Sequence, residues 1–405
     1  MKSKTMKRIL TSVLGAAMTL GLCMGNAVPA MAADGVIEGT EEAPADAYLT
    51  KELQVADGVT VPEAAFSFTF EKTKEDGGAP TAEMPDITDK TVSYIETDTV
   101  TPDESGLKKI KKMSGKILDG VTFSHAGEYE YKVTETQAVS GYVVDPDKET
   151  MEYSKAEYTM RVIVNNKADG NGVYVKYVVV NRVKNDAGAE EAAKVSAGDD
   201  VTANTFTFTN VFTRTGSALD WNDTKKPSPL EISKTVTGDA GDKTKAFDFT
   251  LTLTKSPTEA DAVTEYPAVI TRADGTTENV TVSVGVSYTF RLKHGEKLSF
   301  DKGAGATGTL LPAGTRYTIA ETAVDGYTTS AQIKENGGTS ITVNDVQAGN
   351  KLVGDHENYA KYTNDKGVTP PTGIIINNLP FLLLIGAAIG AFVLFIAARR
   401  RRSMR

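Results

Sequence analysis

The chain alternates between apolar and polar residues over short segments that are separated by turn residues. Ala65 to Phe70 and Ala246 to Leu251 carry an apolar side chain at every second position. Side chains change face at each residue of a β-strand, so this pattern predicts strands with one buried face. Tyr158 to Val164 and Val173 to Val180 predict a hairpin. We find no helical period between the two termini, and the pattern therefore predicts an all-β protein built from β-sandwiches.

The strand-rich part of the chain consists of two related regions, which predicts two tandem domains. Ala126-Gly127 leads to Glu135-Thr136 and Gly141-Tyr142 in the first region, and Ala313-Gly314 leads to Glu321-Thr322 and Gly326-Tyr327 in the second. The predicted division is a secretory signal at 1–32, a mobile segment at 33–47, an N-terminal sandwich at 48–213, a linker at 214–229, a C-terminal sandwich at 230–366 and a C-terminal signal at 367–405.

Each region also places a Lys, a Glu and an Asn, in that order, on faces that the alternation predicts to be buried. We call them the N-terminal trio (Lys51, Glu135 and Asn210) and the C-terminal trio (Lys234, Glu321 and Asn364). Such side chains are rarely buried without a partner. Taken singly, each could be a lysine reaching solvent, a charge protecting a sheet edge or a turn residue. The same order in both regions favours two groups of buried, interacting side chains.

The three side-chain types of a trio permit a covalent reaction. Burial lowers the pKa of a lysine and raises that of a glutamic acid, so both can be neutral together. The neutral amine can then attack the asparagine carboxamide, while the glutamic acid polarises the carbonyl and passes a proton to the departing ammonia. The trios therefore predict a Lys–Asn isopeptide bond in each domain, with Glu135 and Glu321 in catalytic roles.

The N-terminal residues are typical of an export signal. Four basic residues precede the apolar stretch Ile9 to Met24, and Ala30-Met31-Ala32 provides a small-x-small cleavage site. A short membrane anchor is the alternative. Cys23, the single cysteine, would be removed with the signal. The exported chain would then have no disulfide, no thiol nucleophile and no thiolate metal site.

The C-terminal residues predict a membrane-spanning helix with a cytoplasmic end. Leu379 to Ala398 is uncharged, and the basic run Arg399 to Arg402 follows it. Just upstream lies the pentapeptide Thr369-Pro370-Pro371-Thr372-Gly373. This arrangement resembles the sorting signal that sortases read in Gram-positive bacteria, whose pattern is Leu-Pro-x-Thr-Gly, with Thr369 in place of the leucine. The resemblance implies cleavage between Thr372 and Gly373 and attachment to the cell wall; a plain membrane-anchored stalk is the alternative.

Charge and histidine placement argue against several other functions. The chain has 44 Lys and Arg against 53 Asp and Glu, a net charge of −9, and both terminal signals are basic, so the part between them is more acidic still. Such a chain is a poor partner for nucleic acid. His125, His294 and His356 show no metal-ligand spacing and no nucleophile–base pattern. We therefore expect no metal, no cofactor and no enzyme acting on other molecules.

With these features together, the chain is similar to the major pilins of sortase-assembled Gram-positive pili, in particular the two-domain streptococcal type. The most specific segments are Leu49-Thr50-Lys51-Glu52-Leu53, Tyr131-Lys132-Val133-Thr134-Glu135, Phe208-Thr209-Asn210, Lys234-Thr235-Val236-Thr237-Gly238, Ala320-Glu321 and Tyr362-Thr363-Asn364. The resemblance implies Ig-like or collagen-adhesin-B-like sandwiches with internal bonds from Lys51 to Asn210 and from Lys234 to Asn364. It also implies a structural pilus subunit.

The resemblance further implies polymerisation through a lysine late in the first domain. The candidates are Lys194 and Lys184, at the insertion Lys184 to Asp200, which we expect to be exposed. The implied partners are sortase, identical pilin subunits, and peptidoglycan or a basal pilin, with a host-surface ligand left unidentified. A monomeric wall-anchored adhesin or accessory pilin with the same braced domains is the alternative.

Overall fold

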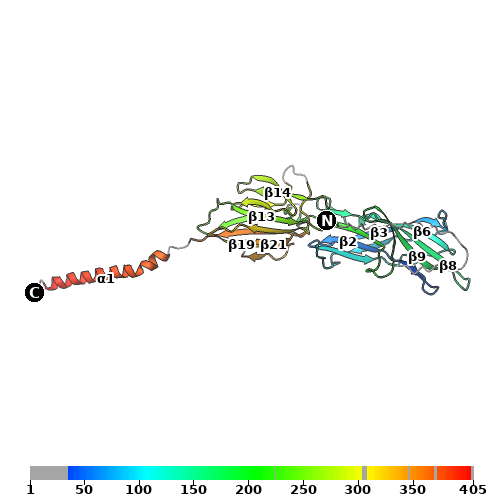
Figure 1. Ribbon diagram of the computed structural model, residues 1–405, viewed down its shortest axis with the longest axis horizontal. Helices are drawn as coiled ribbons and strands as arrows, with labels where there is room; N and C mark the ends of the chain where they lie inside the picture. Colours follow the sequence, from blue (N-terminus) through cyan, green and yellow to red (C-terminus); the bar gives the residue numbers. More distant parts are fainter. Residues whose placement is uncertain (1–34, 223, 303–307, 345–346, 369–371, 403–405) are drawn as a thin grey trace, which may run out of the picture.

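The computed structural model describes residues 35–222, 224–302, 308–344, 347–368 and 372–402. It contains two β-sandwiches lying end to end, and the helix α1 (Thr372–Arg402) follows the second of them (Figure 1). The all-β architecture predicted from the alternating pattern is confirmed.

The N-terminal sandwich is formed by a seven-stranded and a four-stranded sheet. The order of the larger sheet is β1-β9-β8-β6-β3-β4, with β10 also paired to β9, and that of the smaller is β5-β2-β11-β7. The strands are β1 (Val36–Glu38), β2 (Thr50–Ala56), β3 (Ala64–Glu75), β4 (Lys90–Tyr94), β5 (Leu107–Met113), β6 (Gly127–Ser140), β7 (Glu149–Glu152), β8 (Glu157–Asn166), β9 (Val173–Lys184), β10 (Glu190–Val195) and β11 (Thr207–Arg214).

The C-terminal sandwich also pairs a seven-stranded with a four-stranded sheet. Their orders are β15-β14-β17-β12-β22-β19-β20 and β16-β13-β18-β21. The strands are β12 (Glu231–Thr237), β13 (Phe247–Thr254), β14 (Glu265–Thr271), β15 (Thr277–Ser283), β16 (Tyr288–Leu292), β17 (Lys297–Ser299), β18 (Arg316–Glu321), β19 (Thr328–Lys334), β20 (Ile341–Val343), β21 (Gln347–Leu352) and β22 (Tyr359–Asp365).

In each domain, an early strand lies parallel to the last strand. β2 pairs with β11, with Lys51 opposite Phe208, and β12 pairs with β22, with Lys234 opposite Tyr362. Parallel neighbours cannot be joined by a tight turn, so the intervening chain forms the rest of each domain. The strand that carries the lysine of a trio therefore lies beside the strand that carries its asparagine.

The alternation seen in the sequence appears as burial of alternate residues. On β3 the buried positions include Phe66 and Phe68, and on β13 they include Phe247 and Phe249. These rings pack between the two sheets of their own domain, and each domain has its own hydrophobic core. The predicted hairpin is confirmed as the antiparallel pair β8 and β9.

The structure differs from the sequence-based expectation at two places along the edge of the larger N-terminal sheet. Within the segment 33–47, predicted to be mobile, Val36–Glu38 form β1 against β9, and Ala45 and Ala47 are buried. Within the insertion predicted to be an exposed loop, Glu190–Val195 form β10 and also pair with β9. Backbone hydrogen bonds to a sheet edge can order short strands whose side-chain pattern gives no signal.

The two domains are joined by a buried ionic cluster around Arg214, the last residue of β11. Its Nε donates to Glu149 Oε1 at 2.7 Å within the N-terminal domain, and its Nη1 donates to Asp355 Oδ2 at 2.8 Å in the C-terminal domain. Asp355 also accepts from the Thr60 amide at 2.7 Å. The region predicted as a linker at 214–229 thus begins with a side chain that contacts both sandwiches, and it includes the 3₁₀ turn Ala218–Asp220.

Several predicted features fall on residues that the structure does not describe. The secretory signal at 1–32 and residues Thr369, Pro370 and Pro371 lie outside the described residues, as do the side chains of Thr372 and Gly373. The segment Leu379 to Ala398 lies within α1. Among the described residues, no helix is both long enough and apolar enough to cross a bilayer. The membrane span, the sorting pentapeptide and the export signal stay predictions.

Two buried Lys–Glu–Asn trios as the candidate functional site

The N-terminal trio lies between the two sheets of its sandwich. Lys51 on β2 and Asn210 on β11 come from the four-stranded sheet, and Glu135 on β6 comes from the seven-stranded sheet. The lysine and the asparagine are fully buried, and Glu135 is 5% exposed. The trio is therefore held within the hydrophobic core, as the period-two pattern predicted.

One carboxylate contacts both potential reactants of this trio. Lys51 Nζ donates to Glu135 Oε2 at 2.8 Å, and Asn210 Nδ2 donates to Glu135 Oε1 at 2.6 Å. The amine and the amide nitrogen thus lie against opposite oxygens of the same side chain. Glu135 is placed to receive a proton from the lysine and to deliver one to the nitrogen of the asparagine.

Burial changes the titration of this trio in the direction that the reaction requires. Desolvation lowers the pKa of Lys51 to about 8, although the charge of Glu135 acts in the opposite direction. Desolvation also raises the pKa of Glu135, again opposed by its partner lysine. The ring of Phe66 lies 4.7 Å from Lys51 Nζ and contributes to the apolar surroundings. The state with a neutral amine beside a neutral carboxylic acid is consequently populated more readily here than in water.

The C-terminal trio has the same hydrogen bonds as the N-terminal trio, but each side chain comes from the sheet of the other size. Lys234 on β12 and Asn364 on β22 belong to the seven-stranded sheet, and Glu321 on β18 belongs to the four-stranded sheet. Lys234 Nζ donates to Glu321 Oε2 at 2.7 Å, and Asn364 Nδ2 donates to Glu321 Oε1. Desolvation lowers the pKa of Lys234 to about 8, and the Phe247 ring centre lies 4.2 Å from its Nζ. The structure thus brings all six predicted residues into two trios, while their reactivity stays a prediction.

Two residues that the sequence did not indicate lie around the N-terminal trio. The Ser154 amide donates to Asn210 Oδ1 at 2.7 Å, and the Ser154 hydroxyl donates to Asp186 Oδ1 at 2.6 Å. Ser154 lies between β7 and β8, and Asp186 lies in the turn between β9 and β10. Asn185-Asp186-Ala187-Gly188 has the composition of an ordinary turn. No sequence signal distinguishes it from the other turns of the chain.

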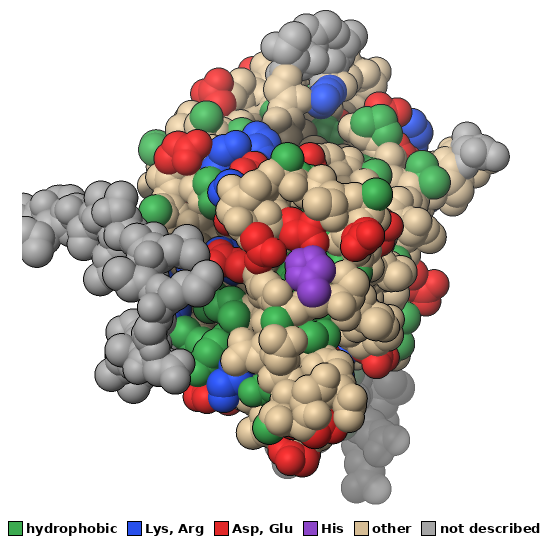
Figure 2. Space-filling view, turned by 90° about the vertical axis from the view of Figure 1, so that its right-hand side faces the viewer, with side chains coloured by type: hydrophobic (Ala, Val, Ile, Leu, Met, Phe, Trp, Pro, Cys, Tyr) green, Lys and Arg blue, Asp and Glu red, His purple; other side chains and the backbone are tan. Residues whose placement is uncertain are grey.

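Among the described residues, neither lysine predicted to link subunits forms a side-chain hydrogen bond or ion pair with a trio. Lys194 is exposed on β10, in register with Asn181 of β9. Lys184 ends β9, and its Nζ is 3.3 Å from Glu157 Oε2. Lys194 lies on the edge strand β10, whereas Lys184 lies on β9 between β8 and β10. Figure 2, which views the end of the molecule formed by the N-terminal domain, shows acidic side chains prominent on the surface among scattered basic ones.

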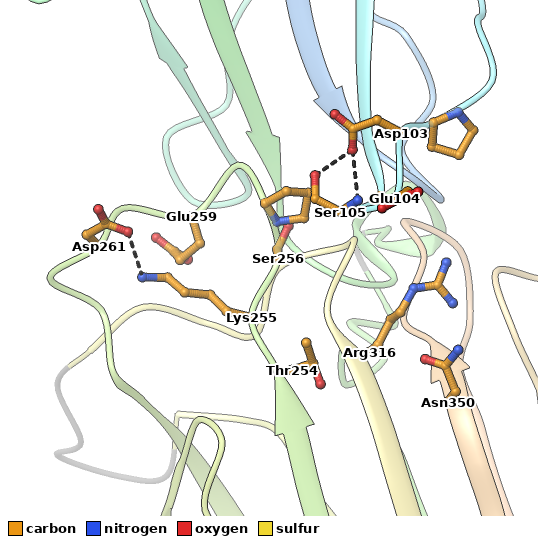
Figure 3. Close-up of a pocket in the computed structure, with 13 residues that line it drawn as sticks. Asp103, Glu104, Ser105, Thr254, Lys255, Ser256, Glu259, Asp261, Arg316 and Asn350 are labelled. Carbon is orange, nitrogen blue, oxygen red and sulfur yellow. Dashed lines mark hydrogen bonds and ion pairs between the residues drawn. The ribbon is translucent and has the colours of Figure 1, made fainter.

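A large surface pocket lies elsewhere, between loops of the two domains (Figure 3). It has a volume of about 690 Å³, and its lining includes Asp103, Ser105, Lys255, Asp261 and Arg316 but no residue of either trio. Asp103 accepts from Ser105, and Lys255 Nζ lies 3.8 Å from Asp261 Oδ1. Over the described residues, no group of three His, Cys, Asp or Glu is arranged to hold a metal ion. This pocket offers no arrangement of catalytic groups comparable with the trios.

Comparison with known families relates both domains to described protein families. Residues 48–213 match the family described as Spy0128-like isopeptide containing domain. Residues 228–366 match a domain of unknown function, DUF7601.

Comparison with curated proteins finds relatives among streptococcal pilus proteins. A pilin of Streptococcus pyogenes serotype M1 is 23% identical over 383 residues, which cover 93% of this chain and 97% of that protein. The pilus tip adhesin Cpa of Streptococcus pyogenes is 34% identical over 145 residues, which cover 36% of this chain but only 18% of the adhesin.

Solved structures of similar sequence include the major pilin from Streptococcus pyogenes and its T-13 counterpart. The first is 23% identical, with 80% of this chain and 99% of that chain covered and a TM-score of 0.35. The second is 26% identical, with coverage of 82% and 100% and a TM-score of 0.33. Scores this low do not establish a common arrangement of the whole chain, so the relationship rests on the sequences. Residues 48–213 match the family of Spy0128-like isopeptide containing domains, and the chain as a whole is similar in sequence to a streptococcal pilin over nearly its full length.

Proposed function

We propose that the protein is the structural subunit of a cell-surface pilus, polymerised and anchored to the Gram-positive cell wall by sortase, with each domain braced by an autocatalytic Lys–Asn isopeptide bond. One observation carries this proposal. In both domains a single buried carboxylate hydrogen-bonds the lysine Nζ and the asparagine Nδ2. Nothing in ordinary core packing requires this costly combination of polar groups twice.

The bond forms by exchange of one amine for another on the asparagine Cγ. The neutral lysine Nζ attacks Cγ, a new C–N bond forms, and the bond from Cγ to Nδ2 breaks. The glutamic acid accepts a proton from the lysine nitrogen and gives one to Nδ2, which leaves as ammonia. No other reactant is consumed, and the glutamic acid returns to its starting state. Contact of the three groups in a site without water supplies the advantage over the same groups in solution.

The bond would stabilise each domain and strengthen it along the stalk. It joins β2 to β11 in the first domain and β12 to β22 in the second, which are neighbouring parallel strands far apart in sequence. By analogy with a disulfide that closes a loop on the order of 100 residues, each bond adds about 4 to 5 kcal/mol. An exported chain without disulfides gains a covalent brace by this route.

Polymerisation would join the Thr372 carbonyl of one subunit to a lysine of the next. Lys194 is the preferred acceptor because it is exposed on an edge strand, and Lys184 is the second candidate because it pairs with Glu157. The relationship to a pilin over nearly the whole chain supports this role. Peptidoglycan or a basal pilin would receive the last subunit.

A wall-anchored adhesin with the same braced domains is the second candidate. It is favoured by the 34% identity to a pilus tip adhesin, which is confined to 145 residues. Electrophoresis of cell-wall extracts from cells that make the protein distinguishes the two functions. A sortase-dependent ladder that disappears in K194A or K184A supports the pilus subunit, and a single anchored band supports the adhesin.

The test of the bonds is the intact mass of a fragment of residues 33 to 368, which leaves out both predicted terminal signals. We expect a mass below the calculated value by two molecules of ammonia. E135A and E321A should each restore one ammonia. An unchanged mass deficit in both variants would contradict the assigned role of the glutamic acids, and the full calculated mass in the unaltered fragment would contradict the bonds themselves.

A further inference from the structure

The carbonyl oxygens of the two trio asparagines have different surroundings. Asn210 Oδ1 accepts a hydrogen bond of 2.7 Å from the backbone amide of Ser154. Asn364 Oδ1 is buried and has no hydrogen-bond partner among the residues that the structure describes. The two domains therefore share the trio but differ in what contacts the oxygen of the reacting carboxamide.

The Ser154 amide also determines which way the carboxamide of Asn210 points. A backbone N–H can only donate, so it must face the oxygen and not the amide nitrogen. With Oδ1 held by Ser154, Nδ2 is directed to Glu135 Oε1 at 2.6 Å. The nitrogen that leaves as ammonia is thereby kept against the carboxyl group that must protonate it.

Asp186 fixes Ser154 relative to the strand that carries Asn210. Asp186 Oδ1 accepts from the Ser154 hydroxyl at 2.6 Å and from the Thr209 amide at 2.8 Å. Thr209 immediately precedes Asn210 on β11. On the other side, Gln137 Nε2 donates to the Ser154 carbonyl at 2.6 Å. The serine amide is thus held between strand β6 and strand β11, at a defined position beside the carboxamide.

Attack on the carboxamide places negative charge on this oxygen. As the lysine nitrogen bonds to Cγ, the electron pair of the C=O bond moves to Oδ1, and it returns when ammonia departs. A preorganised N–H aimed at such an oxygen stabilises the transition state more than the ground state. We propose that the Ser154 backbone amide is the oxyanion donor for the Lys51–Asn210 reaction, and that Asp186 is the positioning residue that holds it. This inference rests on the proposed isopeptide function.

The proposal predicts unequal rates in the two domains of one chain. Removal of a direct oxyanion donor costs roughly 10²- to 10³-fold in rate in enzymes that use one. Because the C-terminal trio has no such donor within the described residues, the Lys51–Asn210 bond should form faster than the Lys234–Asn364 bond. Loss of a positioning residue should cost less than loss of the donor, about 10-fold.

Asp186 also carries a charge, and the effect of that charge can be separated from its contact with Ser154. The charged groups that act on Lys51 are Glu135 on β6, Asp186 in the β9–β10 turn and Glu52 on β2, and each favours the protonated lysine. The same charge also favours the protonated form of Glu135, which the reaction requires, so its effects on the two groups oppose each other. If Asp186 acted through charge alone, its removal would therefore shift the pH profile and leave the maximal rate largely unchanged. If it acts by holding Ser154, its removal slows the reaction.

The experiment follows both bonds during synthesis of the full-length chain in a cell-free reaction. Samples are quenched at intervals and digested, and the two cross-linked peptide pairs, each lighter by one ammonia, are quantified by mass spectrometry. In D186A we expect the Lys51–Asn210 bond to form about 10-fold more slowly, with the Lys234–Asn364 rate unchanged. D186N keeps an oxygen acceptor, so it should react near the unaltered rate with its pH profile moved to lower pH.

Two further variants control for folding and for the choice of residue. D200A removes another aspartate of the same region, which accepts from Thr202 and does not contact the trio, and it should change neither rate. S154A removes the contact to Asp186 but keeps the backbone donor, so it should slow the N-terminal bond in the same direction as D186A. If D186A does not fold, S154A decides the question.

The outcomes separate this inference from the proposed function. Bond formation in both domains, with the N-terminal rate unchanged in D186A or in S154A, would overturn the role of Ser154 and Asp186 and leave the proposed function intact. Equal rates for the two bonds in the unaltered chain would also overturn it. Absence of ammonia loss from both domains of the unaltered chain would instead remove the proposed function itself.

Discussion

The two domains hold the same three side chains in different frameworks. In the N-terminal domain the lysine and asparagine belong to the smaller sheet and the glutamic acid to the larger, and in the C-terminal domain this is reversed. In both, the lysine and asparagine strands are parallel neighbours and the glutamic acid faces them from the opposite sheet. The chemistry therefore depends on the relative positions of the three groups, not on which sheet supplies them.

The comparison also shows how far the similarity extends. Both lysines are fully buried or nearly so, and desolvation lowers the pKa of both to about 8.

The surroundings of the two asparagine carboxamides differ. Ser154 donates to Asn210 Oδ1 and is held by Asp186, whereas Asn364 Oδ1 has no hydrogen-bond donor among the described residues. The hydrogen bonds from lysine and asparagine to the glutamic acid are common to both domains. The contacts of Ser154 and Asp186 occur in the N-terminal domain.

The largest test of this comparison asks whether the two trios act independently. E135A should prevent the bond in the N-terminal domain alone, and E321A the bond in the C-terminal domain alone. The domain that carries the substitution should lose at least about 4 to 5 kcal/mol of unfolding free energy, because the brace is lost and the lysine also stays buried without its carboxylate. Denaturant unfolding of each variant, with the mass of each cross-linked peptide pair as a control, measures this. Loss of both bonds in a single variant would show that the domains are coupled.

A second test concerns the junction that follows the N-terminal trio. R214M should leave Glu149 and Asp355 buried without their cation and destabilise the chain by about 3 to 5 kcal/mol. R316M is the matched control, because Arg316 pairs with Asp57 across the junction at 3.0 Å but is about a third exposed, and it should cost less than about 1 kcal/mol. Equal effects in denaturant unfolding would contradict the importance of burial at this junction.

The smallest expected difference lies in the pH dependence of the two bonds. The reaction needs one proton on each lysine–glutamic acid pair, so it slows at high pH, where that proton is lost. Since the folded-state pKa of both lysines is about 8, the alkaline decline should occur near the same pH in both domains. Above it, each rate should fall about 10-fold per pH unit. Alkaline declines separated by two pH units or more would contradict the electrostatic similarity of the trios.

The period-two pattern by itself indicated the all-β class, several of the strands with their buried faces, and the six polar residues of the trios. This succeeded because the face of a strand residue depends only on its position in the local alternation. Lys51 could be assigned to the side of Leu49 and Leu53 without knowledge of any other strand. The order Lys, Glu, Asn in both regions then indicated which buried groups belong together.

Only the tertiary structure decided which sheet supplies each group and what surrounds it. Strand pairing and turn placement bring Ser154 and Asp186 to Asn210, although both lie in connections with no distinctive pattern. The same holds for β1 and β10, which are ordered by backbone hydrogen bonds to β9, and for Arg214, whose partners come from two domains. Local alternation predicts which way a side chain faces. Its neighbours depend on contacts between segments that are distant in the chain, and these contacts produce no periodic pattern in the sequence.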